Sequence, residues 1–300
     1  MKRFKNILYV SELTVTQDTA IARAVSLAQN NQADLTVVDV IPEQAATIRT
    51  SHGNMNATDL MNAATAKRRA ELDALIVPYR SQLQPTVAVL VGTKFLEIIR
   101  AVLRDDYDLV IKPSENPDWI DRLFGSEDMH LLRKCPCPVW LMKPDEKSNY
   151  ECIVAAVDFD PYAPDTDDTL LNEAILGLSS SLALSDFADL HLVHVCDAPE
   201  AGFAGLWSDN PDMTEMKMIE DVRAYHTSYM GNITRRLREQ LGADTYAYLS
   251  PRVHLPTGSA SKAIPTLVKQ LQADLVVMGT VARTGIPGFI IGNTAESILD

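Results

Sequence analysis

The sequence lacks the features that mark exported, membrane-spanning and disulfide-rich proteins. No apolar run in its 300 residues reaches the length of a transmembrane helix, and residues 1–6 lead into the short strand-like segment 7–10 rather than into a signal-peptide core. The four cysteines show no spacing typical of a disulfide framework. We therefore expect a soluble, cytoplasmic protein with no membrane partner.

Basic residues are also scarce. The chain carries 40 Asp and Glu against 27 Lys and Arg, which gives a formal charge of −13. Proteins that bind DNA or RNA neutralise phosphates with Lys and Arg, so this balance argues against a nucleic-acid partner. It stays compatible with a small anion site built from backbone N–H groups.

The familiar catalytic spacings are missing too. The chain has no Gly-x4-Gly-Lys-Ser/Thr phosphate loop, no Gly-x-Ser-x-Gly elbow and no His-Glu-x-x-His pair. We predict no catalytic residues and no strong nucleotide hydrolase. The alternative is a slow hydrolase that uses a metal bound to the phosphates.

What the sequence does contain is an internal repeat. Residues 33–40 resemble residues 188–195, and both segments have the apolar, β-branched composition of a buried strand. Residues 107–112 resemble residues 273–278 at a separation of 273 − 107 = 166 positions. The chain therefore holds two copies of one unit.

Glycines and helical patterns repeat along with these strands. Gly92 and Gly258 have the same separation, 258 − 92 = 166. Apolar residues recur at helical spacing between the strands of each half. These apolar stripes are Ile21, Ala24, Val25 and Ala28, then Leu72, Leu75, Ile76, Tyr79 and Leu83 in the first half, and Leu171, Ala174, Ile175, Leu178 and Leu182, then Val222, Tyr225, Tyr229, Ile233, Leu237 and Leu241 in the second.

Strands that alternate with helices predict an α/β fold, with a doubly wound, Rossmann-like parallel sheet in each half. The polar segment 143–149 is the expected linker, which gives an N-terminal domain of residues 1–147 and a C-terminal domain of residues 148–300. Residues 137–142 are expected to form a fifth strand in the first domain. The second domain stops early in a helix, so its last strand is expected to be missing or supplied by another element.

The most informative segment is the glycine-rich stretch 277–294, which leaves a strand, forms a loop and enters a helix. Glycine allows positive φ and a close approach of the backbone, and free N–H groups at a helix start favour an anion. Asn293 and Thr294 are placed to cap that helix. The segment predicts a cradle for a phosphate-bearing ligand.

This segment resembles the signature of the universal stress protein family, Gly-x2-Gly-x9-Gly followed by Ser, Thr or Asn. Gly279 and Gly292 are in register with it, whereas Ala282 replaces the second glycine and keeps the N–H while restricting φ. The repeat resembles the tandem members of the family, and the resemblance covers nearly the whole chain. It implies two domains of the adenine nucleotide alpha hydrolase-like fold, packed as an intramolecular pseudo-dimer.

The resemblance also implies a ligand and its contacts. In ATP-binding members, residues ending the first two strands frame the adenosine and the glycine loop holds the phosphates, so ATP or a related nucleotide, with Mg²⁺ on its phosphates, is expected. The alternative for Asp158 is a simple role in a turn. The implied binding residues are Asp158, Val195, Gly258, Met278, Gly279, Ala282, Gly292, Asn293 and Thr294.

The first domain departs further from the family pattern. Ser11 is matched to Asp158, and Pro113, which has no N–H to donate, replaces Gly279. The acidic residues Glu115, Asp118 and Asp121 would also repel an anion. We expect this domain not to bind ATP in the family manner and to serve as a packing partner.

Two groups of residues invite other interpretations. His191, His194 and Cys196 suggest zinc, but residues three apart on a strand point to opposite faces, so the two imidazoles are not expected to share a metal. Cys135 and Cys137 lack the Cys-x-x-Cys spacing of a redox pair and are interpreted as the entry to a strand.

The apolar loop 202–207 is compatible with either a lid over the ligand or simple core packing. As a lid it would favour a ligand that joins a phosphate to an apolar or sugar portion. We thus expect a stress-response binding protein for a nucleotide-like ligand. The alternatives are the slow hydrolase and a ligand-free scaffold, and a homodimer of the tandem chain is compatible with each.

Overall fold

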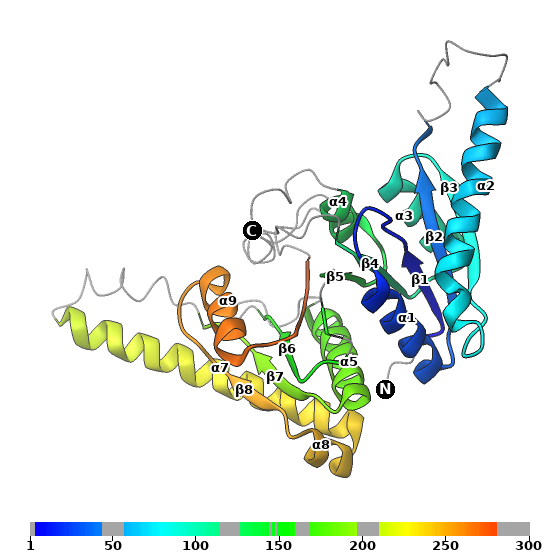
Figure 1. Ribbon diagram of the computed structural model, residues 1–300. Coiled ribbons are helices and arrows are strands. Elements are labelled where there is room, and N and C mark those ends of the chain that lie inside the picture. Colours follow the sequence, from blue (N-terminus) through cyan, green and yellow to red (C-terminus); the bar gives the residue numbers. More distant parts are fainter. Residues whose placement is uncertain are drawn as a thin grey trace. The chain divides into compact units, whose positions relative to one another are not determined.

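The computed structural model describes residues 4–43, 57–114, 127–143, 146–147, 149–159, 168–196 and 210–280. These residues form two compact units that meet in sequence between residues 148 and 149. Each unit is built around its own parallel sheet (Figure 1). The predicted α/β fold with two parallel-sheet domains is confirmed.

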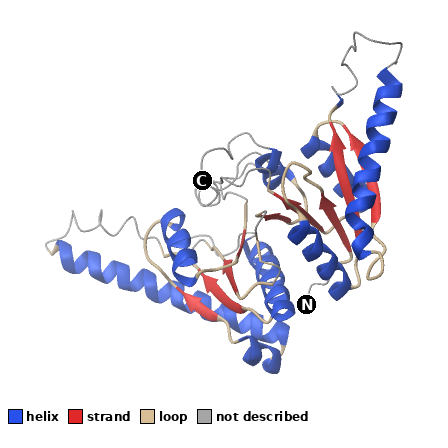
Figure 2. Ribbon diagram, viewed as in Figure 1, coloured by secondary structure: helices blue, strands red, loops and turns tan. Residues whose placement is uncertain are grey.

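The N-terminal sheet has five strands in the order β3-β2-β1-β4-β5, and every neighbouring pair is parallel (Figure 2). The strands are β1 (Asn6–Val10), β2 (Asp34–Ile41), β3 (Thr86–Val91), β4 (Leu109–Pro113) and β5 (Val139–Met142). β1, β2 and β4 are largely buried, because parallel strands are covered by helices on both faces.

Helices α3 and α4 cover one face of this sheet, where Ile98 and Leu131 pack against Leu8 and Val110. Helices α1 and α2 lie over the other face (Figure 1). The helix predicted from the stripe ending at Leu83 is shorter in the structure, because the proline ring at position 78 cannot continue an α-helix. The helices are α1 (Asp18–Asn31), α2 (Ala57–Ile76), the 3₁₀ turn η2 (Val77–Tyr79), α3 (Lys94–Asp105) and α4 (Glu127–Lys134).

The described part of the C-terminal sheet has the order β8-β7-β6-β9, again all parallel. Its strands are β6 (Cys152–Ala156), β7 (Asp189–Val193), β8 (Arg252–His254) and β9 (Leu275–Met278). The helices are α5 (Asp168–Asp186), α7 (Pro211–Leu241), α8 (Ala243–Leu249) and α9 (Ala260–Leu271). Residues 281–300, on which the prediction of a missing last strand depends, lie outside the described residues.

Helix α9 packs on one face of this sheet, where Ile264 contacts the cluster formed by Val154, Ala156 and Val193. Because successive strand residues point to opposite faces, His194 and Cys196 lie on the other side from Val193 and Val195. Helix α7 supplies His226 to that other side. Among the described helices, none combines the length and the apolar character that crossing a membrane requires.

The backbone repeats between the two domains. Gln32 and Phe187 both take a left-handed conformation after a helix, at a separation of 187 − 32 = 155. Asp106 and Gln272 do the same at 272 − 106 = 166. The sequence repeat is therefore a repeat of turn geometry as well as of strands.

Candidate nucleotide site and a histidine–cysteine cluster

The carboxyl ends of β6, β7 and β9 lie at one edge of the C-terminal sheet. Ala156 pairs with Val193 on one side and with Met278 on the other, so the residues that follow these three strands lie side by side. In parallel α/β sheets this edge is where ligands bind. Of the predicted binding residues, Asp158, Val195, Gly258, Met278 and Gly279 lie at this edge, and Ala282, Gly292, Asn293 and Thr294 lie outside the described residues.

Asp158 makes the turn contact that the sequence presented as one of two alternatives. Its Oδ1 accepts a hydrogen bond from the N–H of Phe159 at 3.0 Å, which is a turn contact. Asn172 fixes the same turn, because its side-chain oxygen accepts from the N–H of Asp158 at 3.1 Å and its amide donates to the Asp158 carbonyl at 2.6 Å. The Asp158 side chain nevertheless stays 70% exposed, so the carboxylate can still accept a hydroxyl from a ligand.

A side chain would be unfavourable at both described glycines of this edge, but for different physical reasons. Gly258 has a φ of +111°, which an L side chain rarely adopts, and its N–H donates to the carbonyl of Cys196 at 3.0 Å. A Cβ on Gly279 would lie 2.6 Å from Cδ2 of Leu171 on α5. A side chain on Gly279 would therefore displace Leu171, and a side chain on Gly258 would be strained by the backbone conformation.

The N-terminal domain corrects one match made from the sequence. The N–H of Ser11 donates to Val38, whereas the N–H of Val157 donates to the equivalent Val193, since 193 − 38 = 155. Ser11 therefore corresponds to Val157, and the counterpart of Asp158 is Glu12. The match was off by one residue because short apolar strands hold no marker of register.

Glu12 is not exposed like Asp158. It is 5% exposed and forms ion pairs with Lys94 and with Lys112, whose Nζ lies 3.6 Å from Glu12 Oε2 and 2.7 Å from Asp128 Oδ1. Burial acts to raise the pKa of Glu12, but the hydrogen bond and charge of Lys94 outweigh it and the pKa is lowered. The N-terminal edge is thus occupied by buried, mutually paired charges.

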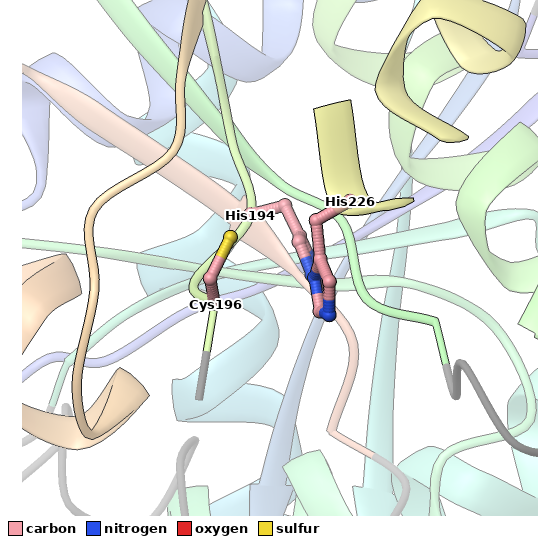
Figure 3. A group of neighbouring side chains, drawn as sticks. All are labelled: His194, Cys196 and His226. Carbon is pink, nitrogen blue, oxygen red and sulfur yellow. The ribbon is translucent and has the colours of Figure 1, made fainter. Parts of the chain in front are cut away.

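In the C-terminal domain a cluster of three buried side chains lies next to the same edge (Figure 3). His194 follows β7, Cys196 comes two residues later, and His226 lies on α7. Nε2 of His194 is 2.7 Å from Nδ1 of His226, and one ligand atom from each of the three residues lies within 4.8 Å of the others. Phe159 stacks on the His194 ring at a centroid distance of 4.1 Å.

Comparison with known sequences identifies the family. A profile of the Universal stress protein family matches residues 3–143 and again residues 149–300. The chain belongs to the universal stress protein family.

The relatives of this universal stress protein match it over nearly the full length of both chains. It is 26% identical to universal stress protein E of Escherichia coli K12 over 100% of this chain and 92% of the relative, and 25% identical to a homolog from Haemophilus influenzae over 99% and 94%. A crystal structure of a universal stress protein from Archaeoglobus fulgidus matches with a TM-score of 0.62 at 18% identity, covering 98% of this chain and 94% of that one. These likenesses confirm the resemblance and the fold.

Sequence reasoning missed His226 and the pairing of His191. His191 Nδ1 lies 2.8 Å from Nε2 of His254 on the neighbouring strand, away from His194. The partner of His194 is 226 − 194 = 32 residues downstream on a helix. The alternation of side chains along a strand does not predict which helix residue will contact that strand. The available signal was the i, i+2 spacing of His194 and Cys196, which places both on one face.

Proposed function

We propose that this universal stress protein is a cytoplasmic stress-response protein whose C-terminal domain binds ATP or a related nucleotide, with Mg²⁺ on the phosphates. The observation that carries the proposal is the edge formed by β6, β7 and β9. The exposed carboxylate of Asp158 shares this edge with Gly258, where nothing lies within 4 Å of the position that a Cβ would take. A carboxylate can accept hydrogen bonds from the hydroxyls of a ribose, and the space beside Gly258 would let the ligand approach the backbone.

The N-terminal domain supports the view that each chain has a single nucleotide site. In the position of Asp158 it has Glu12, and in the position of Met278 it has Lys112, since 278 − 112 = 166. Both side chains are buried and bind each other, so a ligand would have to break an ion pair to reach them. We propose that this domain does not bind nucleotide.

The test is to purify the full chain under native conditions, denature it and identify released small molecules by mass spectrometry. We expect ATP or a nucleotide conjugate at no more than one per chain, and an increase in melting temperature when ATP and Mg²⁺ are added to the emptied protein. A ligand-free protein that shows no such increase overturns the proposal. The remaining alternative is then the ligand-free scaffold.

Two variants control this test. Gly292→Asp places a negative charge in the predicted phosphate loop and should abolish both signals. Gly231→Asp makes the same change on the exposed surface of α7, where nothing lies within 4 Å of the added Cβ, and should keep both. Accumulation of ADP in proportion to the protein, lost in Gly292→Asp, would identify the slow hydrolase.

A further inference from the structure

The cluster of His194, Cys196 and His226 has the composition of a metal site that no part of the nucleotide proposal uses. All three side chains are buried, with exposures of 3%, 3% and 4%. Figure 3 shows the two imidazoles lying alongside each other, with Cys196 on the same segment as His194. Two imidazoles and one thiol form an N₂S donor set, which suits zinc.

The hydrogen bonds of the cluster already orient its lone pairs. Nδ1 of His194 lies 3.2 Å from the carbonyl of Val157, which can only accept, so Nδ1 carries the proton and Nε2 carries a lone pair. This backbone contact is the kind of outer contact that fixes the tautomer of metal-binding histidines. Nε2 points away from β6 toward His226.

His226 has an unpaired polar atom. Because Nε2 of His194 accepts, Nδ1 of His226 must donate to it across 2.7 Å, which leaves Nε2 of His226 without a proton. That atom is buried and has no hydrogen-bond partner among the described residues. If this Nε2 takes the proton instead, Nδ1 of His226 presents its lone pair toward Nε2 of His194, and one cation can bridge the two ring nitrogens.

The other copy of the repeat shows that the fold does not require this set. The position of His194 corresponds to Asp39, since 194 − 155 = 39, and Asp39 pairs with Arg68 of α2 at 3.1 Å. The position of Cys196 corresponds to Ile41. An ordinary ion pair thus links strand and helix in the first domain, whereas three ligand-type side chains meet in the second.

We propose that His194, Cys196 and His226 bind one zinc ion in the C-terminal domain, leaving a fourth coordination position for water or a ligand. With zinc–nitrogen bonds of about 2.0–2.1 Å and a zinc–sulfur bond of about 2.3 Å, tetrahedral ligand atoms lie roughly 3.3–3.6 Å apart. The two facing ring nitrogens separate slightly from 2.7 Å, and one ligand atom from each of the three residues already lies within 4.8 Å of the others.

The binding step balances without a redox change. Zinc displaces the hydrogen bond between the rings and takes the lone pair of His194 Nε2. The His226 proton shifts from Nδ1 to Nε2, which frees the Nδ1 lone pair for the metal. The Cys196 thiol gives its proton to buffer as the sulfur–zinc bond forms, and hydrating waters leave the ion.

The test uses cobalt as a visible substitute for zinc in the full chain. Cys135 and Cys137, whose sulfurs lie 3.7 Å apart, are another thiol pair, so both are changed to Ser in the starting protein. After treatment with a chelator, this protein is titrated with Co²⁺ without nucleotide. We expect one equivalent of Co²⁺ to give the absorption of a tetrahedral thiolate complex, and one equivalent of Zn²⁺ to remove it.

Three variants decide which residues bind the ion. Cys196→Ser should lose the thiolate absorption, and His226→Gln should weaken zinc binding at least about tenfold. Cys152→Ser, which removes the other cysteine of the same domain, should leave both unchanged. Circular dichroism shows whether each variant is folded.

The parent titration alone can overturn the proposal. No tetrahedral spectrum in the starting protein, or a spectrum that survives in folded Cys196→Ser, means that the cluster is only a buried hydrogen-bonded pair beside a thiol. Because the titration contains no nucleotide, its outcome is independent of the proposed nucleotide binding.

Discussion

Two carboxylates at equivalent positions of the repeat have opposite surroundings. Glu12 is 5% exposed and paired with two lysines, whereas the Asp158 side chain is 70% exposed. A buried carboxylate contributes to stability through its partners, whereas an exposed carboxylate keeps its contact with solvent. The same position thus supports structure in one domain and, as we propose, binding in the other.

Glu12→Gln is expected to destabilise the N-terminal domain at pH 7. Lys112, which is 1% exposed, and Lys94 both lose the carboxylate of Glu12 as an ionic partner. We expect a loss of about 3 kcal/mol in the free energy of unfolding, at the low end for breaking a buried pair because the amide keeps some hydrogen bonds. Denaturant titration of the full chain measures it.

The same variant should change the response to acid. The folded pKa of Glu12 is lowered below its ordinary value of 4.5, so its contribution to stability is complete above that pH and is lost as the pH falls through the folded pKa. Glu12→Gln should remove this part of the acid-induced loss. Asp73→Asn, at an exposed pair with Arg80, is the control and should cost less than about 1 kcal/mol. Equal losses in both variants would contradict the buried network.

At the scale of elements, the contact between β9 and α5 depends on Gly279. Gly279→Ala brings a Cβ within 2.6 Å of Leu171 Cδ2, which must move. Leu171 is 37% exposed and has room to rotate, so we expect a loss of only about 1 kcal/mol, the low end for overpacking. Adding Leu171→Ala should remove this penalty, so the double variant loses less stability than the two single variants together.

Gly177→Ala is the matched control for this prediction. Gly177 lies within α5, and nothing lies within 4 Å of an added Cβ. Alanine in a helix interior is favoured over glycine by about 0.5–1 kcal/mol, so this variant should be slightly more stable. Additive losses in Gly279→Ala with Leu171→Ala would show that the glycine has another role.

The sequence predicted the strands, because apolar β-branched runs repeated at fixed separations, and it predicted which edge of the sheet would collect Asp158 and Gly258. It did not predict α8, whose seven residues, Ala243–Leu249, are too few for a helical apolar stripe. It also matched Ser11 instead of Glu12 to Asp158, because the register of a parallel strand depends on its neighbours' hydrogen bonds. Contacts between a strand end and a distant helix, such as His194 with His226, require the fold itself.

At the scale of the whole molecule, two units with separate sheets predict that a ligand of one domain protects that domain alone. We expect saturating ATP and Mg²⁺ to slow amide hydrogen exchange in peptides from residues 149–280 and to leave peptides from residues 4–114 unchanged. At a hundredfold excess over Kd, binding stabilises the domain by about 2.7 kcal/mol, or about a hundredfold slower exchange at amides that exchange only by unfolding of that domain.

The distribution of this protection separates three mechanisms. Protection confined to the C-terminal peptides, and absent in Gly292→Asp, places the ligand at the edge of β6, β7 and β9. Protection of both domains in the parent chain, lost from both in Gly292→Asp, would show that the domains unfold as one unit. If the N-terminal peptides stay protected in Gly292→Asp, the first domain binds nucleotide as well, and the buried pair of Glu12 with Lys112 does not close its site.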